Sequence, residues 1–275
     1  MNPITPYAAV YAARFKVLLQ YRAAALAGFV TQCWWGVMRI MVLAAFFTSG
    51  TGAAQPITLG QSMTYVWLGQ AFLMLLPWSV DPETTRLVRT GDIAYERLRP
   101  LDAWAFWLAR ALALRTVQPL MRAIPMFVTA GLVLPLVGLG QWGLRPPVGP
   151  GAAALFVISI AGAVALSAVM STLMDVMVAR TLSDRGVTLL ATPLVLLLSG
   201  NIVPLPLLPA PLKSFLFLQP FAGLTDIPFR IYFGELAGAR ALEGLMVQAT
   251  WIVLIALFGR RLMAGTMARL QVQGG

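Results

Sequence analysis

DPETTRLVRTGDIAYERLRPLD, residues 81–102, holds five acids and four arginines, whereas charged residues make up only 11% of the whole chain. Asp81, Pro82 and Glu83 predict a helix start, because they supply an N-cap side chain, a proline at the first helical position and an acid near the positive end of the helix dipole. Gly91 predicts the helix end after about two turns, followed by a turn and an extended segment. The aspartate that ends the stretch predicts the N-cap of the next helix. A helix this short needs a surface to pack on.

The rest of the chain is too apolar for an ordinary soluble domain. Hydrophobic residues make up 59% of the 275, and the mean hydropathy is +0.79. The long uncharged runs show no period-two alternation, which favours membrane-spanning helices over a barrel. With about 20 residues to a span, the chain predicts an all-α integral membrane protein with one domain and six transmembrane helices.

The six spans are expected in the uncharged runs between the polar segments. They fall at residues 23–48, 59–80, 120–139, 152–174, 187–199 and 245–258, with residues 103–119 as an interfacial lead-in and residues 175–186 as a cytoplasmic loop. Residues 1–22 predict an amphipathic helix flat on the cytoplasmic surface, or else a cytosolic extension of the first span. Four prolines between residues 204 and 211 preclude a continuous helix, so residues 204–240 predict a re-entrant or irregular outer segment between spans five and six.

Basic residues predict the orientation. In this topology twelve arginines and lysines fall on one side and four on the other, leaving out four arginines within or near the first and third spans. Because cytoplasmic loops carry the excess of positive charge, both termini are expected in the cytoplasm. The net charge of +10 is scattered over span ends and therefore indicates membrane orientation and not nucleic-acid binding.

The chain lacks the residues that several kinds of chemistry require. The chain has no histidine and one cysteine, Cys33, which excludes histidine-based metal sites and internal disulfides. No phosphate-binding glycine loop precedes a lysine, so the chain is not itself a P-loop ATPase and binds no cofactor of its own. Catalytic residues do not cluster, and we expect no enzyme. All ten acids are expected in loops or at span ends, which counts against a proton- or sodium-driven carrier.

Four short motifs follow one another along the chain. They are Thr90-Gly91-Asp92-Ile93 with Leu98-Arg99-Pro100-Leu101, then Ser199-Gly200-Asn201-Ile202-Val203-Pro204-Leu205, then Leu218-Gln219-Pro220-Phe221, and last Val272-Gln273-Gly274-Gly275. Together with the amphipathic start, their order resembles the permease subunits of bacterial ATP-binding-cassette (ABC) exporters of the type-2 class. The resemblance implies the bacterial inner membrane, a second permease chain, identical or paralogous, and separate ATPase subunits that bind ATP and Mg. It also implies export of an amphipathic or hydrophobic compound.

The resemblance also implies two sets of site residues. The loop between spans two and three resembles the cytoplasmic coupling helix that docks on the ATPase, so the expected contact residues are Asp81, Glu83, Arg86, Arg89, Gly91, Asp92, Glu96, Arg97, Arg99 and Pro100. Spans one, two and five are expected near the two-fold axis, so the pathway candidates are Gln32, Arg39, Tyr65, Gln70, Ser199 and Asn201.

Alternatives stay open for both sets. Arg39 is expected about 24 Å from the inner edge of the membrane, where it either reaches outward to headgroups or faces a cavity or a neighbouring subunit. The charged stretch is either a docking site or a solvated loop. A passive channel, a secondary carrier without an ATPase, or a scaffolding membrane protein are the competing functions.

Overall fold

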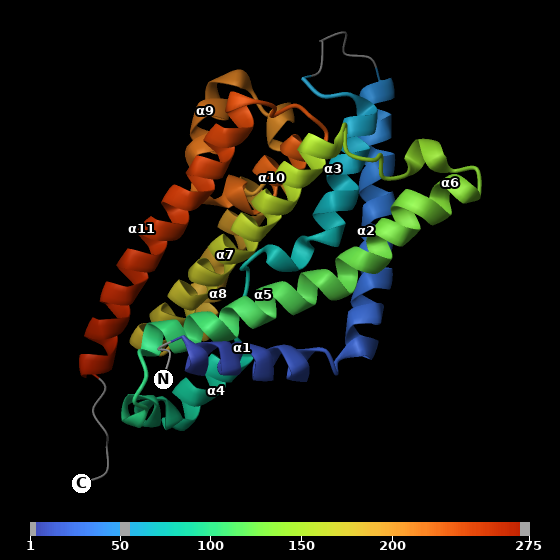
Figure 1. Ribbon diagram of the computed structural model, residues 1–275. Coiled ribbons are helices and arrows are strands. Elements are labelled where there is room, and N and C mark those ends of the chain that lie inside the picture. Colours follow the sequence, from blue (N-terminus) through green and yellow to red (C-terminus); the bar gives the residue numbers. More distant parts are fainter. Residues whose placement is uncertain (1–3, 50–55, 270–275) are drawn as a thin grey trace.

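The computed structural model describes residues 4–49 and 56–269, and every regular element in these residues is helical (Figure 1). Within them, four helices are long and apolar enough to cross a membrane. They are α2 (Arg22–Thr48), the run from α5 (Ala103–Val128) to α6 (Leu134–Leu136), α7 (Pro150–Thr181) and α11 (Ala239–Arg269). The predicted all-α class is confirmed for the described residues, and these four helices are candidates for membrane spans.

The predicted second span at residues 59–80 is wrong as a continuous helix. α3 (Leu59–Ala71) has 13 residues, nearly all buried, and is followed by a 3-10 turn, η1 (Leu73–Leu75). The chain then runs without helix to α4 (Pro82–Thr90). The helix therefore breaks inside the bundle, where backbone carbonyls cannot bond to water.

Donors from two other helices stabilise the break. The Arg115 guanidinium donates to the carbonyls of Met74 and Leu76, at 3.0 and 3.3 Å. The Ser167 hydroxyl donates to the carbonyl of Leu75. Non-helical backbone is tolerated at membrane depth where protein groups satisfy it, and here α5 and α7 supply those groups.

The predicted interfacial lead-in at residues 103–119 is also wrong. α5 is one helix through Pro119 and Pro125, and a π-helical turn, η3 (Thr129–Val133), carries it into α6. Asp102 caps it as expected, accepting the Ala105 N–H at 2.9 Å. Arg110 and Arg115, both in this stretch, are buried against protein partners and therefore do not mark the membrane boundary.

α7 extends past its predicted end. It runs to Thr181, where Leu182 adopts a left-handed φ of 56°, and Ser183 then caps α8 (Asp184–Leu198) by accepting the Gly186 N–H at 3.1 Å. Asp175 thus lies buried in α7 and not in a cytoplasmic loop. The expectation that every acid lies in a loop or at a span end fails here, and Asp226, which has no exposed surface, is the most deeply buried acid of the described residues.

After α8 the chain folds into short helices. They are η5 (Leu205–Leu207), α9 (Ala210–Leu218), η6 (Pro220–Leu224) and α10 (Asp226–Tyr232). α10 is almost entirely buried and packs on α7. In Figure 1, α9 and α10 lie toward the end of the bundle away from α4. The proline-rich stretch thus contains no continuous long helix, and none of these helices is long enough to cross a membrane.

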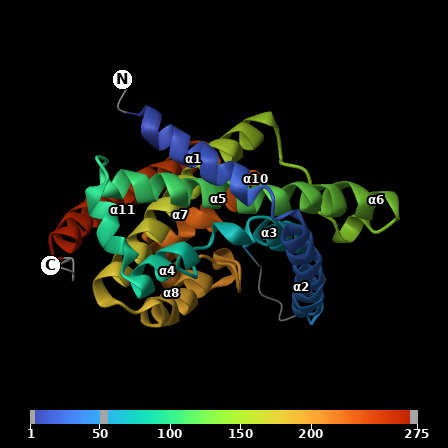
Figure 2. The same ribbon diagram turned by 90° about the horizontal axis from the view of Figure 1, so that it is seen from below.

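At the other end, α1 (Thr5–Leu18) lies across the bundle and runs along α5 when seen from below (Figure 2). Its Tyr7 and Val10 contact the core, and the Tyr7 hydroxyl accepts the Asp102 N–H at 3.0 Å. The start of α1, α4 and the end of α11 lie at this same end (Figure 1).

Candidate partner-binding surface and polar interior

The helix at the start of the charged stretch forms as its sequence predicts. The Asp81 side chain accepts the Glu83 N–H at 2.9 Å, and Gly91 ends α4 with a φ of 77°. The prediction fails just beyond, because residues 92–98 form a 3-10 helix, η2 (Asp92–Leu98), instead of a turn and an extended segment. The extended exit begins only at Arg99.

One side of α4 is tied into the bundle by ion pairs. Asp81 is buried, and Arg14 of α1 lies 3.4 Å from its carboxylate and 2.8 Å from that of Glu83. Arg110 of α5 approaches the same two acids at 3.5 and 3.0 Å. The Asp81 N–H donates to Asp175 of α7 at 3.1 Å. Three helices therefore meet at the first residues of α4.

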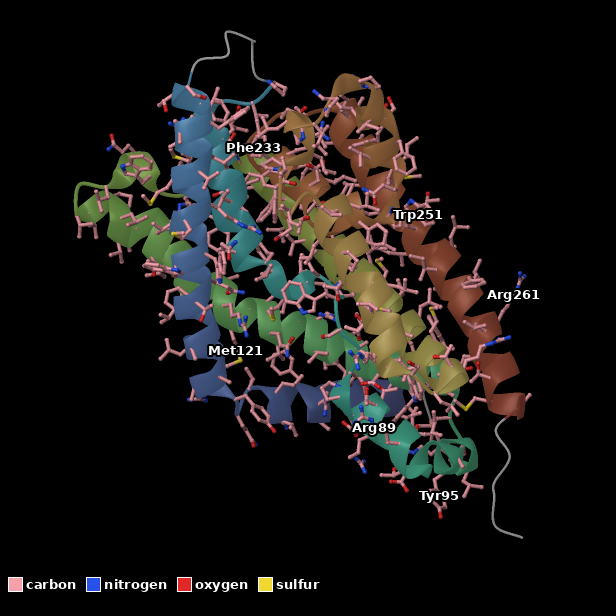
Figure 3. All side chains as sticks on the ribbon, turned by 180° about the vertical axis from the view of Figure 1, so that it is seen from behind. Arg89, Tyr95, Met121, Phe233, Trp251 and Arg261 are labelled. Carbon is pink, nitrogen blue, oxygen red and sulfur yellow. The ribbon has the colours of Figure 1, made fainter. Side chains whose placement is uncertain are left out.

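The other side of the same segment is exposed. The side chains of Arg86 and Arg89 are 59% and 71% exposed, and their ion pairs to Asp92 and Asp184 are long, at 3.4 and 3.3 Å. Such surface pairs contribute little stability and are easily exchanged. Figure 3 shows Arg89 and Tyr95 at this end of the molecule.

The ten expected contact residues fall into three groups. Six lie at the surface: Arg86, Arg89, Gly91, Asp92, Arg99 and Pro100. Three acids are held by partners within the chain, namely Asp81, Glu83 and Glu96, and the Arg97 side chain lies outside the described part. Glu96 is buried, with Arg99 at 3.2 Å and the Trp107 indole N–H at 3.4 Å. Tyr95 and Leu98 were not among the expected contact residues, but both are exposed beside these charges.

A polar cluster lies inside the bundle. Arg39 is half-buried, and its guanidinium donates to the backbone carbonyl of Asn201 at 2.6 Å and to the Asn201 side-chain oxygen at 3.2 Å. The Gln70 amide, turned so that both of its ends are satisfied, accepts from Arg39 and donates to the Gln32 carbonyl, each at 3.3 Å. Arg39 therefore bonds to the chain after α8.

The two remaining pathway candidates lie beside this cluster. The Ser199 hydroxyl accepts the Asn201 N–H at 3.3 Å. The Tyr65 hydroxyl donates to Asp226 at 3.0 Å and packs so closely on Gly200 that a Cβ there would clash. All six candidates are thus close together, contributed by α2, α3 and the end of α8.

Some buried polar atoms of this cluster have no hydrogen-bond partner within the described part of the chain. Both amide atoms of the Gln32 side chain and the Asn201 side-chain nitrogen are buried without a hydrogen-bond partner in the described residues. Buried polar groups normally have partners, so water or a ligand group is expected at these atoms.

No family model, no curated protein and no solved structure matches this chain. The last of the four motifs, residues 272–275, lies outside the described residues.

Proposed function

We propose that the chain is the transmembrane permease subunit of an ABC transporter. It exports an amphipathic or hydrophobic compound, driven by ATP hydrolysis on separate nucleotide-binding subunits. It pairs with a second permease chain, identical or paralogous, in a bacterial inner membrane. It has six spans, the short α3 and α8 among them, and both termini are cytoplasmic. The order of its motifs supports this assignment.

The two-sided construction of residues 81–99 is the observation that carries the proposal. A solvated loop that merely supplies positive charge needs no internal anchor. Here Asp81 and Glu83 are held by Arg14 and Arg110, while Arg86 and Arg89 of the same helix project outward. A partner whose charged groups replace Asp92 and Asp184 in the weak outer ion pairs would push on a helix whose inner side is fixed to the bundle.

The polar interior supports a transport role for the same chain. Polar and charged residues inside a membrane bundle are costly and mark pathways more often than structure. Arg39 links α2 to the segment after α8, and Gln70 of α3 joins them. A rearrangement of α2 against this segment would expose the cluster to a cavity.

A secondary carrier is the second candidate, and two buried acids favour it. Asp175 and Asp226 are both fully enclosed by the bundle, and buried carboxylates are the groups that couple transport to protons or cations. Asp226 bonds to Tyr65 and Arg230, and Asp175 bonds to the Asp81 N–H. An ATPase partner separates the two candidates.

The test uses the charge-reversed double variant Arg86→Glu with Arg89→Glu. The full chain is co-expressed with a candidate ATPase from a neighbouring reading frame, and co-purification and ATP hydrolysis of the complex are measured. The double variant should release the ATPase or lower the complex's activity at unchanged permease expression.

The control is Arg180→Glu with Arg185→Glu, two exposed arginines of the α7–α8 region outside the charged stretch. Retention of the ATPase and of full activity by the Arg86/Arg89 variant would contradict the docking surface. Transport that proceeds without ATP and follows a pH gradient would favour the carrier.

A further inference from the structure

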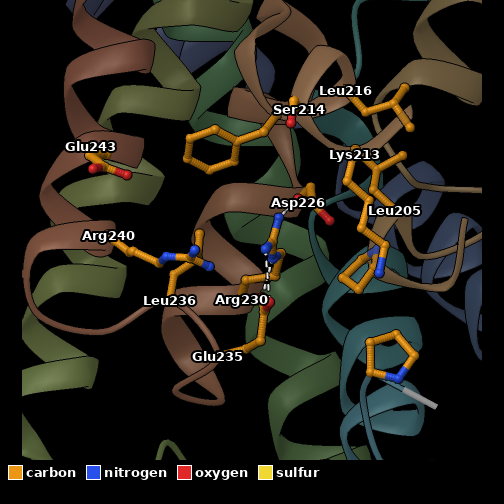
Figure 4. Close-up of a pocket in the computed structure, with 13 residues that line it drawn as sticks. Leu205, Lys213, Ser214, Leu216, Asp226, Arg230, Glu235, Leu236, Arg240 and Glu243 are labelled. Carbon is orange, nitrogen blue, oxygen red and sulfur yellow. Dashed lines mark hydrogen bonds and ion pairs between the residues drawn. The ribbon is translucent and has the colours of Figure 1, made fainter. Parts of the chain in front are cut away.

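A second polar site lies at the end of the bundle opposite α4. A pocket of about 420 Å³ opens between α9, α10 and the start of α11 (Figure 4). Six charged residues line it, namely Lys213, Asp226, Arg230, Glu235, Arg240 and Glu243. Three are basic and three are acidic. What the pocket can bind therefore depends on which of these residues pair with each other.

The inner wall is a closed ion cluster. Arg230 donates to Asp226 at 3.0 Å and to Glu235 at 2.8 Å, with a further bond from its Nε to Glu235. The hydroxyl of Tyr65 holds the second oxygen of Asp226. Burial raises the pKa of Asp226 to about 6, against the opposing effect of the Arg230 charge. The cluster is held within the chain and forms a fixed wall, but one guanidinium faces two carboxylates, so it keeps an excess of one negative charge.

Three charges at the rim are left over. Lys213, Arg240 and Glu243 form no ion pair in the described residues, and residues 50–55 contain no acid or base that could supply one. In Figure 4, Lys213 lies on one side of the ion cluster, and Arg240 and Glu243 lie on the other. The rim thus carries two positive charges and one negative charge, and with the excess negative charge of the ion cluster the pocket is neutral overall, which fits a zwitterion better than a simple anion.

We propose that this pocket binds a small zwitterion that carries a phosphate group and an ammonium group. A phosphate monoester has a charge of about −1.5 to −2 at neutral pH, which matches Lys213 and Arg240. The guanidinium offers a planar fork for phosphate oxygens, and the lysine offers a compact point charge. Glu243 accepts the ammonium group. The volume is that of about fourteen water molecules, which suits a headgroup-sized ligand.

Two sources could supply a phosphate and an amine: a soluble aminoalkyl phosphate, which is a monoester, or the headgroup of a phospholipid with an amine, which is a phosphodiester with a single negative charge. The site does not involve the ATPase-facing surface, so its test is independent of the proposed function. It uses the purified full chain in nanodiscs of phosphatidylglycerol, which lacks an amine, and calorimetric titration with phosphoethanolamine and with inorganic phosphate.

Wild type should bind phosphoethanolamine more tightly than inorganic phosphate. Lys213→Gln and Arg240→Gln should each weaken both ligands about tenfold, the effect of losing one charge-assisted hydrogen bond. Glu243→Gln should weaken phosphoethanolamine and leave phosphate unchanged. The control is Arg145→Gln, an exposed arginine that does not line the pocket and should bind as wild type does.

Nanodiscs that contain phosphatidylethanolamine separate the two sources. If the lipid occupies the pocket, the apparent affinity for added phosphoethanolamine should fall in these discs, and Lys213→Gln should remove the difference. An unchanged affinity assigns the site to the soluble ligand. The proposal is overturned if neither ligand binds, or if Lys213→Gln and Arg240→Gln bind as tightly as Arg145→Gln.

Discussion

The break between α3 and α4 should depend on Arg115. Replacement by methionine keeps an unbranched side chain of similar length but removes the donors to the Met74 and Leu76 carbonyls. The buried Met74 carbonyl is left without a partner, which costs about 1–3 kcal/mol, whereas the Leu76 carbonyl loses one donor and keeps the Trp78 N–H at 3.0 Å. The Ser171 hydroxyl also loses a donor, although it still donates to Ser167 at 2.7 Å. Removal of a buried charge offsets part of this loss, so we expect a net destabilisation of about 2–4 kcal/mol.

The assay is thermal unfolding of the purified chain in detergent. At about 2–4 °C for each kcal/mol, the unfolding temperature of Arg115→Met should fall by about 5–15 °C. Limited proteolysis should also cut between residues 72 and 81 earlier than in wild type. The matched control is Arg122→Met on the same helix, since Arg122 is half-buried and donates no hydrogen bond within the described residues. Equal losses in the two variants, or an unchanged Arg115→Met, would refute this account of the break.

Three further outcomes follow from the site. A cysteine at position 213 on a Cys33→Ala background should react with an impermeant reagent from outside the cell, and labelling only from the cytoplasm would reverse the topology. Arg39→Gln should alter transport-linked ATP hydrolysis at normal expression, because it removes the charge bound at Asn201, whereas transport at the wild-type rate would exclude a pathway role. Asp175→Asn keeps an acceptor for the Asp81 N–H and should keep ATP-driven transport, while a proton-coupled carrier would lose its activity.

The ends of helices were predictable because their signals are local. Asp81 and Gly91 lie next to the backbone groups that they cap, and Asp102 caps the next helix in the same way. The proline-rich stretch after α8 was predictable for the same reason, since proline restricts its own turn. The 3-10 helix η2 was not predicted. Glu96 was expected at the surface because it is charged, but it is buried and accepts a hydrogen bond from the Trp107 indole.

The interior of the bundle was not predictable, because its polar partners are distant in sequence. Arg115 lies 41 positions from Met74, and Ser167 lies 92 positions from Leu75. A single sequence shows hydropathy but not which donor will meet a broken helix, so residues 59–80 looked like one span. Asp175 was placed in a loop because it is charged. Its hydrogen-bond partner, the Asp81 N–H, lies 94 positions away in the sequence.

The same distant contacts connect the two candidate sites. Asp175 of α7 binds the start of α4, and one turn earlier Ser171 of α7 accepts a hydrogen bond from Arg115 of α5. Arg115 fixes the break that follows α3, and α3 carries Gln70, the partner of Arg39. Spatial continuity alone does not transmit a signal, since coupling needs an element with two arrangements. In the break after α3, the Met74 and Leu75 carbonyls are held by side chains and not by a helix ladder, so a shift of α7 against α5 would exchange those bonds without unwinding a helix.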